Sequence, residues 1–127
     1  MNQPHYKMSI KLYQSEKSFG PGMMSLLGGV EETGSLQKSA KRMGMAYSKA
    51  WTMIRRAEQE WGFPMTERTV GGKDGGGSVV TVQAKRLMDS YAAFLKDAGD
   101  AVDTVFARHF SSDKLESIIR GERQPNE

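Results

Sequence analysis

The stretch SLQKSAKRMGMAYSKAWTMIRRAEQEW, residues 35–61, decides the fold of this 127-residue chain. It predicts a short helix at 36–43 that Ser35 caps, a turn at Gly44 and a longer helix at 46–61. Apolar side chains recur at intervals of three and four in both helices, as expected for two helices that pack together. They are Leu36, Ala40, Met43, Ala50, Met53, Ile54, Ala57 and Trp61. The pattern is that of a helix-turn-helix.

The charges of this stretch indicate a polyanionic partner. Between Thr33 and Ala57 the chain has six Lys or Arg residues and no Asp or Glu. In DNA-binding helix-turn-helix motifs the leading end of the second helix meets base edges in the major groove. We expect Tyr47, Ser48, Lys49 and Thr52 to contact bases. Phosphate contacts are expected mainly from Lys38, Arg42, Arg55, Arg68 and Lys73, and Ser35 completes the expected DNA-binding set.

A charged face on one amphipathic helix is usually only a solvated face. Here three independent features coincide: the spacing of the two helices, the absence of acidic residues, and a β-hairpin expected after the second helix. Together they favour DNA binding over a merely solvated surface.

Two elements are expected before the motif. Met8 to Leu12 alternates apolar and polar residues and predicts a short strand that needs a partner strand. Pro21 opens a helix that ends near Gly34, and its paired glycines, Gly28 and Gly29, favour close approach of another helix. The buried stripe of that helix is expected to be Met23, Met24, Leu26, Leu27 and Val30.

A hairpin is expected after the motif. Strands at 65–70 and 78–81 flank a loop that contains five glycines and Lys73. Placed after a recognition helix, this hairpin is the wing of a winged helix. The loop does not match a nucleotide-binding phosphate loop, because Glu67 stands where the first glycine is needed and Asp74 where the hydroxyl is needed.

Residues 81–110 predict a long amphipathic helix. Its apolar stripe exceeds what one small domain can bury, so a second copy of the chain is the expected partner. A break at Gly99 would give two shorter helices instead. A last helix is expected at 113–120, before a polar tail at 121–127. The expected dimerisation residues are Leu87, Tyr91, Phe94, Ala98, Val102 and Val105.

The predicted fold is therefore mainly α with a small β-hairpin wing: a winged helix-turn-helix at 1–80 and a long dimerisation helix with a tail at 81–127. Residues 1–86 hold thirteen basic and seven acidic residues, whereas 87–127 hold five and eight. The basic half is expected to face DNA, and the acidic half water or another subunit.

Composition excludes several classes of function. The chain has no Cys, so neither disulfides nor thiolate chemistry is available. No apolar run reaches the roughly 20 residues that span a bilayer, and a cytoplasmic protein without a membrane partner is expected. His5 and His109 are the only imidazoles and lie at opposite ends, so neither a metal site nor a catalytic triad is expected. We therefore expect no enzyme.

Several of these residues carry a family resemblance. They are Thr33, Gly34, Ser35, Ala40, the run from Met45 to Trp51, Glu67, Arg68, Gly71, Gly72, Lys73, Gly75, Gly76, Gly77, Val80 and Thr81. In this pattern the chain resembles the DNA-binding domain of the molybdate-responsive ModE regulators over about residues 6 to 110. It is more distantly similar to the LysR-type winged helix through Ile54, Glu58, Gly62, Arg68 and Thr81.

The resemblance implies a transcription regulator that pairs through the long helix and binds a palindromic operator as a homodimer. In that family molybdate is held by separate C-terminal domains. We expect these sensing domains to be absent from this chain, and hence no cofactor. Two rivals stay open: an architectural protein that binds DNA with little sequence preference, and a protein-interaction module that kept only the fold.

Overall fold

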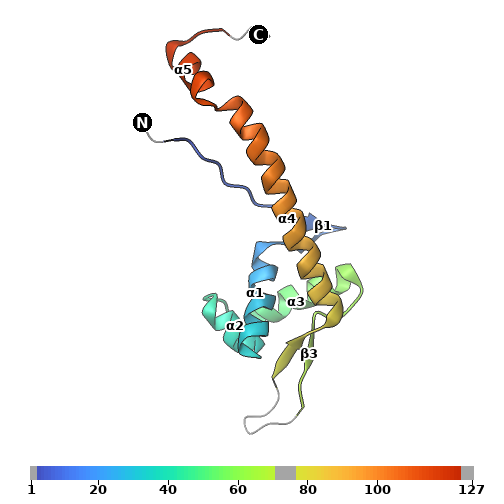
Figure 1. Cartoon of the computed structure of the whole chain (residues 1–127). Helices are drawn as coiled ribbons and strands as arrows, with labels where there is room; N and C mark the ends of the chain where they lie inside the picture. The colour runs from blue at the N-terminus through green and yellow to red at the C-terminus, as the bar shows by residue number, and fades with distance from the viewer. Residues whose placement is uncertain (1–2, 71–76, 124–127) are drawn as a thin grey trace. The chain divides into compact units, whose positions relative to one another are not determined.

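The computed structural model describes residues 3–70 and 77–123 and is mainly helical (Figure 1). Two short antiparallel hairpins accompany the helices, β1 with β2 and β3 with β4. The predicted winged helix-turn-helix with a long C-terminal helix is confirmed. Its elements are β1 (Leu12–Tyr13), β2 (Lys17–Phe19), α1 (Pro21–Thr33), α2 (Leu36–Arg42), α3 (Tyr47–Trp61), β3 (Thr66–Arg68), β4 (Ser78–Val80), α4 (Val82–His109) and α5 (Ser112–Arg120).

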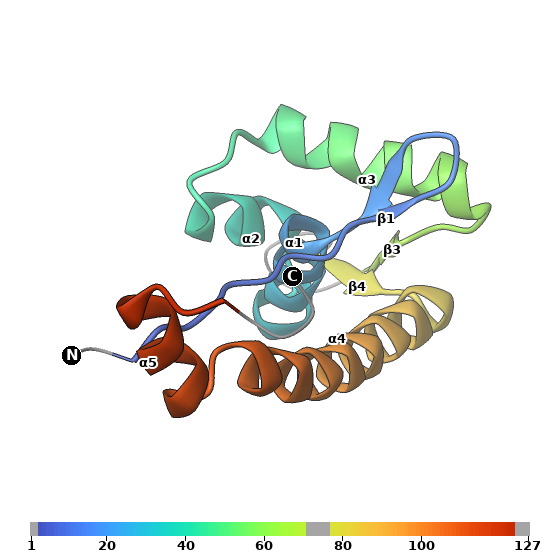
Figure 2. The same ribbon diagram turned by 90° about the horizontal axis from the view of Figure 1, so that it is seen from above.

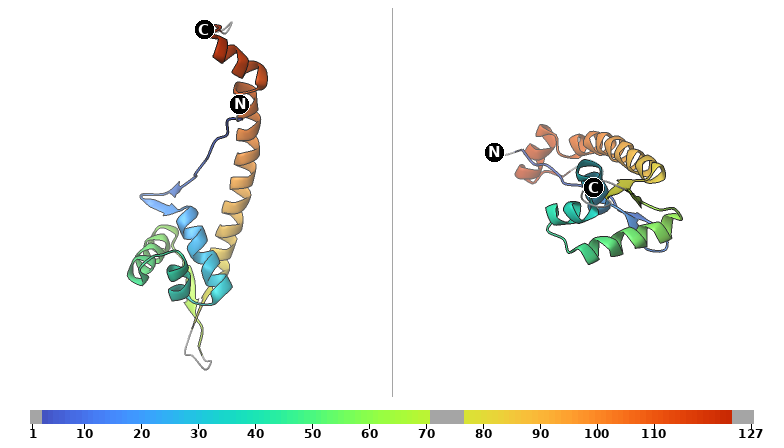
Figure 3. Two further views of the ribbon diagram at one scale, coloured as in Figure 1. Left: turned by 90° about the vertical axis from the view of Figure 1, so that its left-hand side faces the viewer. Right: turned by 90° about the horizontal axis from the view of Figure 1, so that it is seen from below.

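The chain forms two compact units. One comprises residues 9–91, and the other combines residues 3–8 with residues 92–123. In the first unit α1, α2 and α3 pack against one another, and β4 lies against α1 (Figures 2 and 3). The unit extends past the boundary predicted at residue 80, because the first turns of α4 bury Ala84, Met88 and Tyr91 in its core.

The helix ends follow local signals in the sequence. The Ser35 hydroxyl oxygen accepts a hydrogen bond from the Lys38 N–H, as expected for a helix cap. Gly34, Gly44 and Gly62 have φ values of 71°, 66° and 82°, which only glycine adopts readily. These glycines end α1, turn the chain after α2, and end α3. The turn between the two helices of the motif is therefore encoded locally.

The core of the first unit is formed by the predicted helical stripes together with residues from β2 and the start of α4. Met24, Met53 and Trp61 are only half-buried at its edge. The buried apolar residues are Phe19, Met23, Leu26, Leu27, Val30, Leu36, Ala40, Ala50, Ile54, Ala57, Met65, Ala84, Met88 and Tyr91.

The strand predicted at Met8 to Leu12 is wrong in position. Only Leu12 of that range is in a strand, and β1 pairs with β2, which the sequence pattern did not predict. A segment of alternating apolar and polar residues becomes a strand only where its backbone can hydrogen-bond to another strand, and here that partner strand is β2, the next segment of the same chain. Phe19 of β2, rather than the earlier alternating residues, supplies the large buried side chain.

The wing hairpin is shorter than predicted. Strands β3 and β4 pair Thr66 with Val80 and Arg68 with Ser78. The Ser78 N–H donates to the Gly34 carbonyl oxygen at 2.8 Å, which holds the wing to the turn between α1 and α2. Residues 71–76 lie outside the described residues.

The long helix α4 is a single helix that continues through Gly99, so the predicted alternative of two shorter helices is not found. Ser111 caps α5 by accepting a hydrogen bond from the Lys114 N–H. The predicted last helix at 113–120 is therefore present and begins one residue earlier.

Candidate nucleic-acid interface

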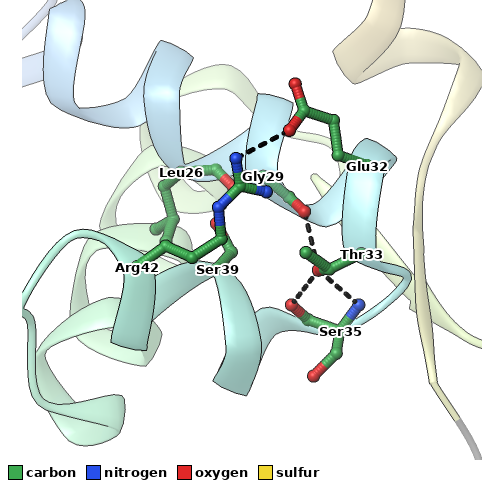
Figure 4. Close-up of polar contacts among 7 residues, drawn as sticks. All are labelled: Leu26, Gly29, Glu32, Thr33, Ser35, Ser39 and Arg42. Carbon is green, nitrogen blue, oxygen red and sulfur yellow. Dashed lines mark hydrogen bonds and ion pairs between the residues drawn. The ribbon is translucent and has the colours of Figure 1, made fainter.

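Helix α2 crosses α1 at very close range (Figure 4). The Ser39 hydroxyl donates a 2.6 Å hydrogen bond to the Leu26 carbonyl oxygen. A side chain at Gly29 would place its Cβ 2.8 Å from the Cβ of Ser39, so this crossing requires glycine. Gly29 thus has the role predicted for the glycine pair, whereas nothing lies within 4 Å of a Cβ at Gly28.

The hydroxyl of Thr33 organises the entry to α2. It lies 2.7 Å from the Gly29 carbonyl oxygen and accepts a hydrogen bond from the Ser35 N–H. Since the Ser35 oxygen is an acceptor in the helix cap, the Ser35 hydroxyl hydrogen can still be donated to an incoming phosphate. Sequence reasoning assigned Ser35 to the DNA-binding set and named Thr33 only as part of the family resemblance, although both contacts of Thr33 are made within four residues along the chain.

The leading half of α3 presents polar and cationic side chains outward. Ala50, Ile54 and Ala57 are buried against the core, whereas Ser48, Lys49 and Thr52 are exposed. The Thr52 hydroxyl donates to the Ser48 carbonyl oxygen at 3.0 Å, so its oxygen remains the group able to accept from a base. The face has the polarity that a major-groove reader requires.

An aromatic and cationic cluster borders these residues. Tyr47, 44% exposed, meets Trp51 edge to face with ring centroids 6.2 Å apart. The Arg55 guanidinium lies 5.7 Å from the Trp51 ring centroid, a cation–π distance. Trp51 therefore orients both Tyr47 and Arg55 on the outer surface of α3.

The remaining predicted cations lie on α2 and on the wing. Lys38, Arg42 and Arg68 are exposed. Arg42 forms a 2.8 Å ion pair with Glu32, and both side chains are more than half exposed. A phosphate would have to compete with this carboxylate for Arg42, although such exposed pairs are weak. Lys73 lies outside the described residues.

Comparison with known proteins relates this arrangement of helices and wing to a protein family. Residues 23–83 match the model of the bacterial regulatory helix-turn-helix protein, lysR family. These residues are a LysR-type helix-turn-helix domain. The match begins in α1 and ends at the start of α4, so it covers the crossing helices, α3 and the wing.

Regulators of the ModE type are similar to this chain. The transcriptional regulator ModE of Haemophilus influenzae is 32% identical over 72% of this chain and 35% of its own length. The DNA-binding transcriptional dual regulator ModE of Escherichia coli is 37% identical over 70% of this chain and 34% of its own length. The molybdenum-pterin-binding protein MopB of Rhodobacter capsulatus is 28% identical over 88% of this chain and 41% of its own length. The matched part thus spans well under half of these relatives.

Two cations that the structure brings together at α3, Lys17 and Arg56, were not assigned to any site by sequence reasoning. Both are exposed, and with Lys49 they line a hollow between β2, the start of α1 and α3. Arg56 belongs to the basic run, but nothing in the sequence pattern relates it to Lys17, because their proximity depends on the β1–β2 hairpin. Lys41 is a further exposed cation, on α2.

The residues predicted for dimerisation divide into two groups. Tyr91 is only 2% exposed and packs edge to face on Phe19 inside the 9–91 unit, so it does not belong to an outer surface. Leu87 is half-buried in the same unit. In the second unit Ala98 and Val102 are half-buried, and Phe94 and Val105 are 47% and 45% exposed.

Within this second unit Tyr6 covers a neighbouring face of α4. Its ring packs on Phe106 at 5.1 Å between centroids, and its hydroxyl contacts the Asp103 carboxylate. The hydrogen bond to Asp103 raises the pKa of the Tyr6 phenol above its ordinary value. Tyr6 therefore holds the N-terminal segment on α4 and leaves the stripe with Phe94 and Val105 uncovered.

In the described part of the chain no helix is long and apolar enough to cross a membrane. The same residues contain no group of three or more His, Cys, Asp or Glu side chains able to hold a metal ion.

Proposed function

We propose that the protein is a DNA-binding transcription regulator that binds a palindromic operator as a homodimer. The observation that carries this proposal is the exposed leading half of α3, which is free of acidic residues and held on a LysR-type framework. Such a helix fits the major groove and offers donors, acceptors and cations to base edges.

In this proposal the contacts divide by location. Ser48, Lys49 and Thr52 contact bases from α3, with Tyr47 beside them. Lys38, Arg42 and Arg55 bind phosphates on the flanks of the groove, and Arg68 does so from the wing. Phosphate contacts supply most of the affinity, and the α3 contacts supply the preference for one sequence.

The uncovered apolar stripe of α4 supports pairing of two copies. Phe94 and Val105 lie about three helical turns apart on it, with Ala98 and Val102 between them. Burying such a stripe against its symmetry mate removes apolar surface from water. A two-fold dimer would present two α3 helices, and therefore requires an operator with two-fold symmetry.

The names of some relatives connect those proteins to molybdenum, since two are molybdenum transport proteins and one is a molybdenum-pterin-binding protein. We extend this connection to the present chain and propose that its target genes serve molybdenum metabolism. The LysR-type family consists of transcription regulators, which supports a role with the chromosome in the cytoplasm and no catalytic activity.

Selection of duplexes from a random pool, followed by anisotropy titrations of the selected and a scrambled duplex, tests the proposal. We expect a palindromic consensus and a specific site bound at least about a thousandfold more tightly than the scrambled one. Equal affinity for both duplexes would instead identify an architectural DNA-binding protein. Failure to bind any duplex at low salt would identify a protein-interaction module.

A further inference from the structure

A hollow of about 370 Å³ lies between β2, the first turn of α1 and α3, entirely within the 9–91 unit. We call it the β2–α3 hollow. It is on the side of α3 that carries Lys49, Met53 and Arg56, and it has the size of an ordinary small-molecule site.

The floor and the rim of the β2–α3 hollow differ in chemistry. Among the lining residues Met23 is buried and Met45 and Met53 are half-buried, so they form an apolar floor of flexible, polarisable side chains that adapt to ligands of different shape. The side chains of Lys17, Lys49 and Arg56 line the same hollow. The β2–α3 hollow is thus lined by three cations and three methionines, and only Met23 of these six residues belongs to the core of the 9–91 unit.

One carboxylate lies near this rim. Glu16 is 4.0 Å from Arg56, and both side chains are more than half exposed. An ion pair of this length and exposure is weak, so a better placed anion can displace Glu16. Lys17 comes from a strand and the other two cations from a helix, so only the folded domain brings the three together.

We propose that the β2–α3 hollow binds a small amphipathic anion, a carboxylate or sulfonate that carries an aromatic ring or a branched apolar chain. The anionic group pairs with Lys17 and Arg56, and the apolar body packs on the three methionines. A bare inorganic oxyanion leaves the methionine floor exposed to water. A neutral molecule of the same shape offers no negative charge to the three cations, and Arg56 keeps only its long ion pair with Glu16.

Lys49 connects this ligand to the DNA surface. It lines the β2–α3 hollow and also belongs to the predicted base-contacting set of α3. A bound anion and a DNA duplex therefore compete for the same ammonium group, and each lowers the affinity of the other by the same factor. This coupling rests on the proposed DNA-binding function, whereas binding of the anion itself does not.

Fluorescence of 8-anilinonaphthalene-1-sulfonate with the full chain, in the absence of DNA, measures the site directly. We expect saturable binding that benzoate displaces, with benzamide and inorganic phosphate each at least about tenfold weaker as competitors. Competition by benzamide as strong as that by benzoate would overturn the proposal, because the anion would then contribute nothing. So would equal competition by phosphate, because the apolar floor would then contribute nothing.

A double variant, Lys17→Gln with Arg56→Gln, should weaken benzoate competition by about tenfold or more. The control is a second double variant, Lys7→Gln with Arg108→Gln, which removes the same amount of charge from residues outside the 9–91 unit. This control should leave benzoate competition unchanged. Undiminished benzoate competition in the first double variant would refute the proposal. If that variant instead loses duplex affinity and salt dependence while its benzoate competition is unchanged, the hollow receives a DNA phosphate and the proposal is also wrong.

Gly22 provides an independent test that does not remove a cation. A Cβ at Gly22 would lie 3.6 Å from the Met53 Cε atom, an ordinary contact directed into the hollow. Gly22→Glu should therefore supply a tethered carboxylate and abolish benzoate competition, whereas the neutral Gly22→Gln should reduce it far less. Equal effects of the two substitutions would contradict an anion site.

Anisotropy titration of the selected duplex with and without saturating benzoate then tests the coupling. We expect several-fold weaker duplex binding by the parent chain and no change in Gly22→Glu. Anion binding without an effect on the duplex would overturn the coupling through Lys49. Since the fluorescence measurement needs no DNA, failure of the proposed DNA-binding function would leave its result intact.

Discussion

The Ser39 hydroxyl donates a 2.6 Å hydrogen bond to the Leu26 carbonyl oxygen, at the point where α2 passes over Gly29 of α1. This contact sets the distance between the two helices that support α3. The adjacent residues Gly28 and Gly29 differ strongly at this crossing, because only a Cβ at Gly29 would overlap a residue of α2.

The first prediction uses this asymmetry. Gly29→Ala should lower the free energy of unfolding by about 1–3 kcal/mol, because the new Cβ overlaps Ser39 in a close-packed crossing. Gly28→Ala is the matched control: it meets nothing within 4 Å and should stabilise α1 by up to about 1 kcal/mol. Urea unfolding of both variants decides this, and equal effects would contradict the close approach.

The second prediction separates base contacts from phosphate contacts. Ser48→Ala should cost about 1–3 kcal/mol on the selected duplex and much less on a scrambled one. Arg68→Ala should weaken binding to both duplexes similarly and lower the salt slope by about one unit. Anisotropy isotherms at several salt concentrations measure both quantities. An unchanged specificity ratio in Ser48→Ala would remove the base-contacting role from that residue.

The third prediction concerns the apolar stripe of α4. Replacing Phe94 and Val105 together by Asp should convert a dimer into a monomer, because both side chains are nearly half exposed in a single chain. Light scattering gives the mass of each species. As a control, Asp substitutions at the exposed Ala93 and Ala107 should leave the dimer intact. A double Phe94 and Val105 variant that is still dimeric would locate the interface elsewhere.

The fourth prediction is that this chain binds neither molybdate nor tungstate with the micromolar affinity of a sensor. The resemblance to ModE regulators assigns that ligand to domains other than the DNA-binding one, and the matched relatives extend well beyond the matched part. Calorimetric titration with either oxyanion should show no saturable micromolar event. Such an event would assign an oxyanion site to this chain.

The fifth prediction concerns Tyr91, whose hydroxyl donates to the Ile10 carbonyl oxygen at 2.7 Å. Burial raises the pKa of the Tyr91 phenol above its ordinary value of about 10. The folded state therefore holds the proton more tightly than the unfolded state, and stability should fall as the pH rises above about 10. Tyr91→Phe should lose part of this pH dependence and about 1 kcal/mol at neutral pH. Urea unfolding at pH 7 and above pH 10 compares the two proteins, and an identical pH dependence would contradict the shift.

Much of the LysR-type domain could be predicted from the sequence, because its signals act over a few residues. Ser35 forms the cap of α2, and Gly34, Gly44 and Gly62 adopt the positive φ values that end α1, turn the chain and end α3. Helical periodicity likewise identifies the buried face of each helix without knowledge of its neighbours.

Other features were decided only by the tertiary structure, because they depend on residues far apart in the chain. A strand was predicted at Met8 to Leu12, but the structure has β1 at Leu12–Tyr13, because this is the segment that pairs with β2. Tyr91 continues the apolar stripe of α4, but it packs on Phe19 of β2 and is buried. Helical periodicity identifies the apolar face of α4 and does not show which part of that face another element covers.

The same limit applies to the charged residues. The sequence alone determined that α3 is basic and amphipathic, and this followed from its own composition and spacing. It could not determine that Lys17 joins Lys49 and Arg56 around one hollow, because the β1–β2 hairpin brings them together through folding. Local conformation was thus determined by short-range sterics and hydrogen bonds, and the juxtaposition of distant side chains by packing of the core.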